Sequence, residues 1–405
     1  MRGCGKVRSE HGGTHLGDRA YGWYPGAAAR RALKFAGKAT LTWLVVVLGV
    51  WSPSVAAKPG QVMQEYPRFS TPLSGACEVQ IDHNGMAWVE QYLSNQIARL
   101  NPATGQIREF RLPNPASVPG GFALAPDGAI WFPEVTGNSL VRLDPDNGRM
   151  TELSIPWSHA FQTPRLHYGT ALSDDATLGP DGAIWFTSAG AYAVGRLDLH
   201  TLQMTKYPLP QPAGPADALL SIIRPGPNHT VVVNQPLENS VATVDVRTGK
   251  VTEYRMPTPA SDPEGVITGP DGAIWVTEAV GQKITRIDPR SGQIEEFSLL
   301  RRNLIHANLL NLRGMPLPHP GAMDVGSDGN LYFAENPVAG SATLGNKLGR
   351  FNPVTHEFDE FPTPTPFSSP CYVYGGQAGS IWFGEFTGNR VGRLIIDNAS
   401  ARRGR

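Results

Sequence analysis

The sequence predicts an all-β fold: a seven-bladed β-propeller of four-stranded antiparallel blades, closed by the N-terminal strand. Two observations predict it. A strand–turn–strand pattern occurs seven times at intervals of 43 to 57 residues, and an unmatched strand precedes the first copy. Glycine and proline, 45 and 36 of the 405 residues, are spread along the chain, as many tight turns require.

Each copy centres on a turn dipeptide followed by an apolar strand. Asp-Gly and Asn-Gly favour tight hairpins because both residues tolerate positive φ. The fourth copy lacks both the glycine and the aromatic residue. The seven copies are residues 84–88, 127–131, 181–185, 228–232, 271–275, 328–332 and 378–382.

The fifth repeat shows the four strands expected of a blade, which we call A to D in chain order. They are predicted at 265–268, 274–277, 283–288 and 295–297. Strand B is apolar on both faces, which indicates a sheet packed between two neighbouring blades.

The last repeat ends after its third strand, at residues 391–396. The unmatched strand at 64–69 resembles the outer strands of other repeats, so we expect it to complete the seventh blade and remove an open edge. The propeller then spans residues 64–396, and 397–405 form a disordered polar tail.

Residues 1–57 are predicted to be a leader with an export signal. A basic segment precedes an apolar run at 41–51, and small residues follow at 55–57. The run is shorter than the roughly 20 residues of a spanning helix. We expect an exported protein, periplasmic or extracellular, with no membrane span after signal removal. An uncleaved anchor is the alternative, and a general or a twin-arginine signal both fit.

The net charge is zero and 17% of residues are charged, so the composition gives no indication of nucleic-acid binding. We expect a monomer with a small-molecule or ester ligand. Because strands alternate in direction, the B–C loops and the connections between blades share one face, here called the top face. Two long connections, 156–173 and 299–320, are expected to wall a pocket there. They carry His167, His306 and His319, and the alternative is inert decoration.

Side chains repeated in most blades are interpreted as structural clamps. An acidic residue follows strand B, an asparagine often follows four residues later, and an arginine recurs in strand C. The acidic set is Glu134, Glu278, Glu335 and Glu385.

Non-repeated side chains at the start of strand A are more informative about function. Eight residues before the turn glycine stand Cys77, Gly120, Asp174, Ser221, Glu264, Gly321 and Cys371, with Glu78 and Tyr372 adjacent. Glu264, Asp174 and Glu78 offer oxygen ligands for Mg²⁺ or another divalent cation. The alternative is a polar, hydrated channel mouth.

Cys77 and Cys371 are 294 residues apart but occupy the same position in the first and last blades. A closed ring makes these blades neighbours, and export favours oxidation. A disulfide is predicted, and free thiols lining the channel are the alternative.

Residues 269–278 and 283–287 resemble the repeat of streptogramin (virginiamycin B) lyases, as do 181–187 and 388–394. The resemblance covers 64–396. It implies a seven-bladed propeller and magnesium-dependent elimination at the ester of a cyclic depsipeptide.

The resemblance also implies two histidines, each after a proline at the start of strand A. Here Cys371, Glu264 and Gly321 stand at that position, and His319 is not equivalent. Elimination needs a general base and a general acid. Glu264, His167 and His306 are the catalytic candidates, and Glu78, Asp174, Tyr372 and His319 are the ligand-binding candidates. The function expected is a metal-dependent lyase or lactonase acting on a cyclic ester, and the alternative is a non-catalytic ligand-binding or protein-interaction propeller.

Overall fold

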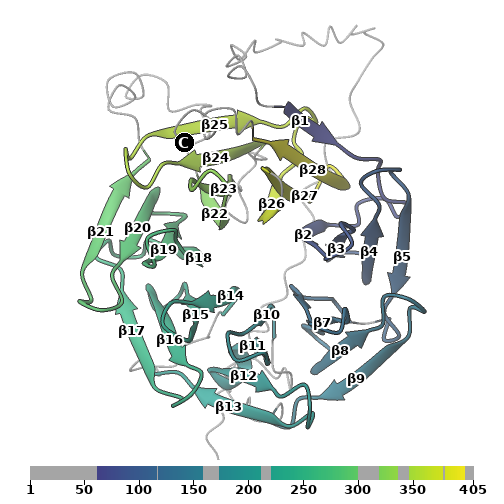
Figure 1. Ribbon diagram of the computed structural model, residues 1–405, viewed down its shortest axis with the longest axis horizontal. Helices are drawn as coiled ribbons and strands as arrows, with labels where there is room; N and C mark the ends of the chain where they lie inside the picture. Colours follow the sequence, from purple (N-terminus) through teal and green to yellow (C-terminus); the bar gives the residue numbers. More distant parts are fainter. Residues whose placement is uncertain are drawn as a thin grey trace, which may run out of the picture. The chain divides into compact units, whose positions relative to one another are not determined.

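The computed structural model describes residues 62–115, 117–157, 173–210, 220–299, 319–335, 346–376 and 379–396, all in one compact unit, Val55–Arg405. The predictions for the leader, the C-terminal tail, His167 and His306 lie outside these residues. The described chain forms seven four-stranded antiparallel sheets arranged as a ring of blades, which confirms the predicted fold class (Figure 1).

Each blade runs from an inner strand A to an outer strand D. Blades 1 and 2 comprise β2 (Ala76–Ile81), β3 (Ala87–Gln91), β4 (Gln96–Leu100), β5 (Ile107–Arg111), and β6 (Ala123–Leu124), β7 (Ile130–Pro133), β8 (Ser139–Leu143), β9 (Met150–Ser154). Blades 3 and 4 comprise β10 (Ala176–Leu178), β11 (Ile184–Ser188), β12 (Ala193–Leu197), β13 (Met204–Pro208), and β14 (Ile223–Gly226), β15 (Thr230–Gln235), β16 (Ser240–Asp245), β17 (Val251–Arg255).

Blades 5 and 6 comprise β18 (Pro263–Thr268), β19 (Ile274–Glu278), β20 (Lys283–Ile287), β21 (Ile294–Ser298), and β22 (Pro320–Val325), β23 (Leu331–Glu335), β24 (Lys347–Phe351), β25 (Phe358–Pro362). Blade 7 comprises β26 (Pro370–Gly376), β27 (Ser380–Glu385), β28 (Arg390–Ile395) and the N-terminal strand β1 (Val62–Glu65). No helix in these described parts is long and apolar enough to span a membrane.

The N-terminal strand closes the ring, as predicted, but it starts two residues earlier than expected. Strand β1 pairs with β28 from Val62 opposite Ile395 to Glu65 opposite Gly392. Beyond Glu65 the ladder is interrupted by Pro67, which has no N–H to donate. The segment stays beside β28 through backbone bonds from Tyr66 N to Val391 O (2.9 Å) and from Phe69 N to Asn389 O (3.0 Å).

The hydrophobic core lies between blades, because strand B buries both of its faces. In β3, Trp88 packs with Phe132 of blade 2, whereas Val89 packs with Trp382 of blade 7. All three tryptophan and phenylalanine rings are at least 96% buried. Burying one large apolar side chain contributes roughly 1.5–3 kcal/mol, so each blade is stabilised mainly by its two neighbours.

The turn aspartates and the strand C arginines have structural partners. Asp181 accepts bonds from Trp185 Nε1 (2.9 Å) and Arg196 Nε (2.7 Å), and Asp271 does the same with Trp275 (2.9 Å) and Arg286 (2.6 Å). The turn is thereby tied to strands B and C.

The repeated asparagines hold the top-face loops. Asn239 has a φ of 56°, accepts from Ser261 N (2.7 Å) and donates to Thr258 O (2.8 Å). Asn389 accepts from Ser74 N (2.8 Å) in the same way, across the closure of the ring. These bonds give the asparagines the structural role expected of them.

Candidate functional site

Irregular pairing shapes the top-face end of the inner strands. The register between strands A and B shifts between Ala76 and Val79 and again between Pro263 and Val266, and blades 6 and 7 show the same shift. Such bulges redirect side chains near functional sites. They therefore reorient the segments that carry Cys77, Glu78 and Glu264.

A strand B side chain holds each of several such segments. Thr187 Oγ1 accepts bonds from the N–H groups of Asp174 (2.8 Å) and Asp175 (3.1 Å), and Thr277 Oγ1 accepts from Gly265 N (2.7 Å). In blade 1 the same position holds Glu90, whose Oε2 accepts from Glu78 N (3.3 Å). Blade 1 thus places a carboxyl where blades 3 and 5 have a neutral threonine.

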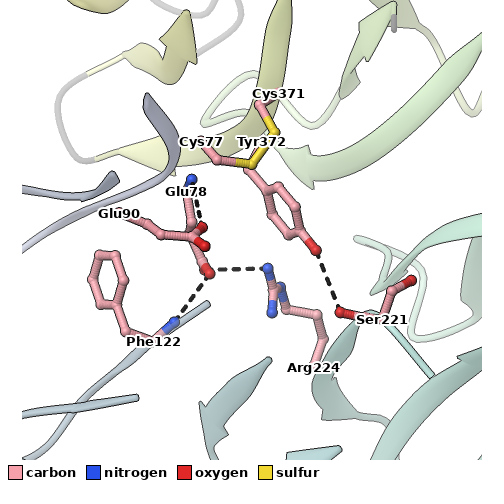
Figure 2. The surroundings of a disulfide bond; sticks show 8 residues. All are labelled: Cys77, Glu78, Glu90, Phe122, Ser221, Arg224, Cys371 and Tyr372. Carbon is pink, nitrogen blue, oxygen red and sulfur yellow. Dashed lines mark hydrogen bonds and ion pairs between the residues drawn. A yellow bond between two sulfur atoms is a disulfide. The ribbon is translucent and has the colours of Figure 1, made fainter. Parts of the chain in front are cut away.

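Cys77 and Cys371 form a disulfide with a Cα–Cα distance of 4.9 Å, so of the two alternatives the structure has the bridge. The bond joins β2 of blade 1 to β26 of blade 7, at the top of the inner strands (Figure 2). It lies beside Tyr372, whose side chain extends toward blade 4.

A single arginine links three blades at the centre of the ring. Arg224 of β14 contacts Glu78 of blade 1 through Nη2 (3.2 Å) and Asp175 of blade 3 through Nη1 (2.5 Å). Glu78 also accepts bonds from Phe122 N (3.1 Å) and Gln80 Nε2 (2.9 Å). Figure 2 shows the guanidinium facing the Glu78 carboxylate beneath the disulfide.

Tyr372 adds a second link across the ring. Its hydroxyl donates to Ser221 O (3.4 Å), and its ring centroid lies 5.4 Å from Arg224 Cζ. Arg224 and Tyr372 therefore join blade 4 to blades 1 and 7 through the centre of the ring. We call Arg224, Glu78, Asp175 and Tyr372 the floor of the top-face site.

Burial shifts the pKa values of the carboxyls in and beside this floor. The Glu78 and Asp175 side chains are 3% and 0% exposed, and Arg224 is 19% exposed. Burial raises the pKa of both carboxyls, and the Arg224 charge opposes the rise. Burial, then the charge of Glu78, raises the pKa of Glu90 well above its ordinary value.

Two half-buried carboxyls at the start of strand A titrate near neutral pH. Burial and then the charge of Asp175 raise the pKa of Asp174 to about 7. Burial and then the charge of Asp262 raise the pKa of Glu264 to about 7. A carboxyl with such a pKa can accept a proton in its ionised form and donate one in its neutral form.

His319 lies on the same face, just before β22. Its Nδ1 is 3.2 Å from Ala279 O, in the loop after β19. A carbonyl oxygen only accepts, so Nδ1 carries the proton and Nε2 of the neutral ring is an acceptor. His319 is therefore held between blades 5 and 6 in a defined tautomer.

The described residues are not grouped as the predicted divalent cation would require. Within the described ranges, no three His, Cys, Asp or Glu side chains are grouped to hold a metal. Glu78 is instead paired with Arg224, whose positive charge disfavours a second cation beside it. We therefore assign no step to a metal, and a cation bound through Glu264, Asp174 and Glu78 stays a prediction.

Arg224 and Asp175 were not among the site residues predicted from the sequence. Among the described inner strands, Arg224 is the one basic residue, and it stands in the most degenerate repeat. A charge in an otherwise apolar inner strand was the available signal. Its partners, Glu78 and Asp175, lie in two other blades, and only the three-dimensional ring shows that they are close to it.

The model of the virginiamycin B lyase family matches residues 55–166 and 173–315, more than half of the chain. The chain belongs to the virginiamycin B lyase family. No curated protein matches it. Family membership agrees with the repeat resemblance and with the seven-bladed ring.

Solved structures agree with this assignment. A catalytically inactive virginiamycin B lyase from Staphylococcus aureus, crystallised with quinupristin, is 26% identical with a TM-score of 0.67, covering 83% of this chain and 100% of that chain. A streptogramin B lyase is also 26% identical, with a TM-score of 0.68 and coverage of 84% and 98%. Hydrazine synthase from Kuenenia stuttgartiensis, 15% identical with a TM-score of 0.59 over 82% and 98%, shares the fold alone.

Proposed function

We propose that this exported member of the virginiamycin B lyase family opens an ester or lactone above the floor of its top-face site, with Glu264 as general base. The observation that carries the proposal is the Glu264 carboxyl. It follows Pro263 at the start of β18, is half-buried, and has a pKa of about 7. That is the strand position to which the family resemblance assigns a histidine.

The proposed chemistry is an elimination. Ionised Glu264 takes the proton from the carbon next to a carbonyl, the electron pair of that C–H bond forms a C=C bond, and the C–O bond to the ester oxygen breaks. The ester leaves as a carboxylate. Asp174, with a pKa of about 7, is suited to donate a proton to this leaving group when neutral.

The floor has the features of a rigid support for such a substrate. Arg224 and Tyr372 are fixed by Glu78, Asp175 and Ser221. A guanidinium has five N–H groups, and only some are used by these partners. We propose that the substrate carbonyl lies against Arg224, where its positive charge stabilises the developing enolate.

The direct test is a panel of cyclic depsipeptides and lactones incubated with the purified mature protein. Mass spectrometry distinguishes elimination, which leaves the mass unchanged, from hydrolysis, which adds water. We expect ring opening by the wild type and a loss of roughly 100-fold or more in kcat/KM for Glu264→Gln. The matched control is Glu295→Gln, an exposed carboxyl in the same blade.

Equal activity of Glu264→Gln and wild type would remove Glu264 from the mechanism. Activity abolished by a chelator and restored by Mg²⁺ would support the predicted cation and contradict a reaction carried by side chains alone. Edman sequencing of the secreted chain tests export, since we expect a mature N-terminus close to residue 57.

A second candidate function is ligand binding without turnover. The disulfide favours it, because Cys371 occupies another strand position at which the resemblance expects a histidine and, once bridged, transfers no proton. Saturable binding of a panel compound with no ring opening over days would establish this alternative.

A further inference from the structure

The bottom face, opposite the proposed catalytic site, contains a tryptophan that lacks its usual hydrogen bond. The strand B aromatic residue donates to the turn aspartate in blades 3 and 5 through Trp185 and Trp275, and in blade 6 through Tyr332. In blade 2, Trp131 is 2% exposed and its Nε1 is buried with no partner. Leaving a buried donor unpaired costs about 1–3 kcal/mol.

A neighbouring Cβ explains this exception. In blades 3 and 5 the residue before the Pro-Asp-Gly turn is a glycine, and a Cβ on Gly179 or Gly269 would lie only 2.6 or 2.4 Å from the indole Nε1. Blade 2 has Ala125 at this position, so its indole cannot take the same place. Asp127 turns outward to Arg142 Nη2 (2.8 Å) and is 55% exposed.

Trp131 lines a pocket between blades 2 and 3. The pocket has a volume of about 620 Å³, within the range of small-molecule sites. Its lining is mostly apolar and includes Trp131, Leu153, Ala183 and Leu199. Two arginine–aspartate pairs, Arg142–Asp127 and Arg196–Asp181, also line it.

The edge of this pocket also carries a strained leucine. Leu202 has a φ of 57° and is 49% exposed. Glycine occupies the matching turn position in four other blades, at Gly105, Gly148, Gly249 and Gly292, each with a positive φ. In blade 6 this position holds His356, also with a positive φ. Leu202 differs in being apolar, and it adds an apolar contact to the pocket.

We propose that the pocket between blades 2 and 3 binds a small apolar molecule with a carbonyl or carboxylate oxygen, which accepts the hydrogen bond from Trp131 Nε1. The apolar wall fits the body of such a molecule. Because Nε1 is buried, the proposed bond forms when the indole edge turns toward the pocket and the ligand oxygen takes the N–H that has no partner. The site is independent of the top-face chemistry, since its residues come from the turns at the opposite ends of the strands.

The chain contains a natural control. The equivalent groove between blades 4 and 5, lined by Thr268, Asp271 and Arg286, has about half the volume, 330 Å³. There the strand position of Trp131 belongs to Val232 of blade 4, whose side chain has no N–H, and glycine rather than leucine, Gly292, occupies the turn position. A groove that merely separates two blades therefore looks different from the one beside Trp131.

The test is a titration of the full mature protein, ¹⁵N-labelled at its tryptophans, with 2-naphthoate. We expect the indole N–H resonance of Trp131 to shift saturably, and that of Trp275 to stay unchanged. Trp131→Phe and Trp275→Phe assign the two resonances. Ala125→Gly gives the indole room to reach Asp127, so we expect it to weaken 2-naphthoate binding about tenfold while keeping the apolar wall.

A Trp131 resonance that does not move at millimolar probe would overturn the proposal. So would Ala125→Gly binding as tightly as the wild type, or Trp275 shifting in parallel with Trp131. Should Trp131→Phe fail to fold, the indole resonance displaced by Ala125→Gly still assigns Trp131. The outcome does not depend on top-face activity, which Glu264→Gln tests separately.

Discussion

Two single carboxyls, Asp174 and Glu264, carry the chemistry proposed for the top face. Asp174 and Glu264 are each half-buried at the start of an inner strand, and each lies near another acidic group, Asp175 or Asp262. Both effects favour the neutral form. The environment of the ring, rather than the residue type, thus brings their titration to neutral pH.

These two carboxyls should make stability depend on pH. Their folded-state pKa values, about 7, are raised above the unfolded values near 4, so the folded state binds more protons between these limits. Their contribution is therefore full below pH 4 and is lost as the pH rises to about 7. We expect the stability difference between wild type and the double variant Asp174→Asn, Glu264→Gln to fall over this range, measured by urea unfolding. A difference that is flat or rises would contradict the assigned shifts.

Arg224 should be essential for stability. Its replacement by methionine leaves Glu78 and Asp175 buried without their counter-charge, which costs about 3–5 kcal/mol. The loss should shrink at acid pH, where both carboxyls are neutral. Arg286→Met is the control, because its pair with Asp271 is about a third exposed, and we expect at most about 1 kcal/mol. Equal losses at pH 5 and pH 8 would show that the charges are not responsible.

At the scale of the strand, most of the architecture could be predicted from the sequence. Turn dipeptides and the apolar stretches beside them located strands such as 274–277 and 283–288 to within a residue of β19 and β20. The neighbouring positions of Cys77 and Cys371 also followed, because equivalent positions of adjacent blades meet in a closed ring.

The side-chain contacts of the sites could not be predicted in this way. The partners of Arg224 depend on the length and direction of one side chain crossing the ring to blades 1 and 3. The unpaired Trp131 depends on one methyl group, that of Ala125. Repeats determine which positions are equivalent, whereas these features arise where one blade departs from the others.

The first and last described strands, β1 and β28, pair in blade 7, where this pairing and a disulfide both hold the ring closed. Strand β1 covers β28, and the disulfide joins the inner strands of blades 1 and 7. We expect Cys77→Ser with Cys371→Ser to lower the free energy of unfolding by about 2–4 kcal/mol, because the bridge restricts the unfolded chain. Guanidinium unfolding under oxidising and reducing conditions measures this. As the matched control, wild type in reductant should lose the same amount of unfolding free energy as the double variant. If neither loses any, the pairing of β1 with β28 is sufficient to keep the ring closed without the disulfide.

In the whole molecule, the two proposed sites lie on opposite faces of the ring. The top face combines a rigid, charge-paired floor with carboxyls that titrate near pH 7, and the bottom face holds an apolar pocket between two blades. The seven-bladed scaffold supports both because its loops and turns diverge while its strands repeat. Family membership accounts for the scaffold, and both proposed sites lie where a blade departs from the repeat.

The measurement that bears most directly on the proposed mechanism is the titration of the Glu264 carboxyl by ¹³C NMR, with Glu264→Gln to assign the resonance. No substrate is needed. We expect a carboxyl carbon that titrates with a pKa of about 7 and disappears from the spectrum of the variant. A Glu264 resonance titrating near the ordinary glutamate value would mean that this carboxyl is not poised for proton transfer at neutral pH, and would contradict its role as the general base.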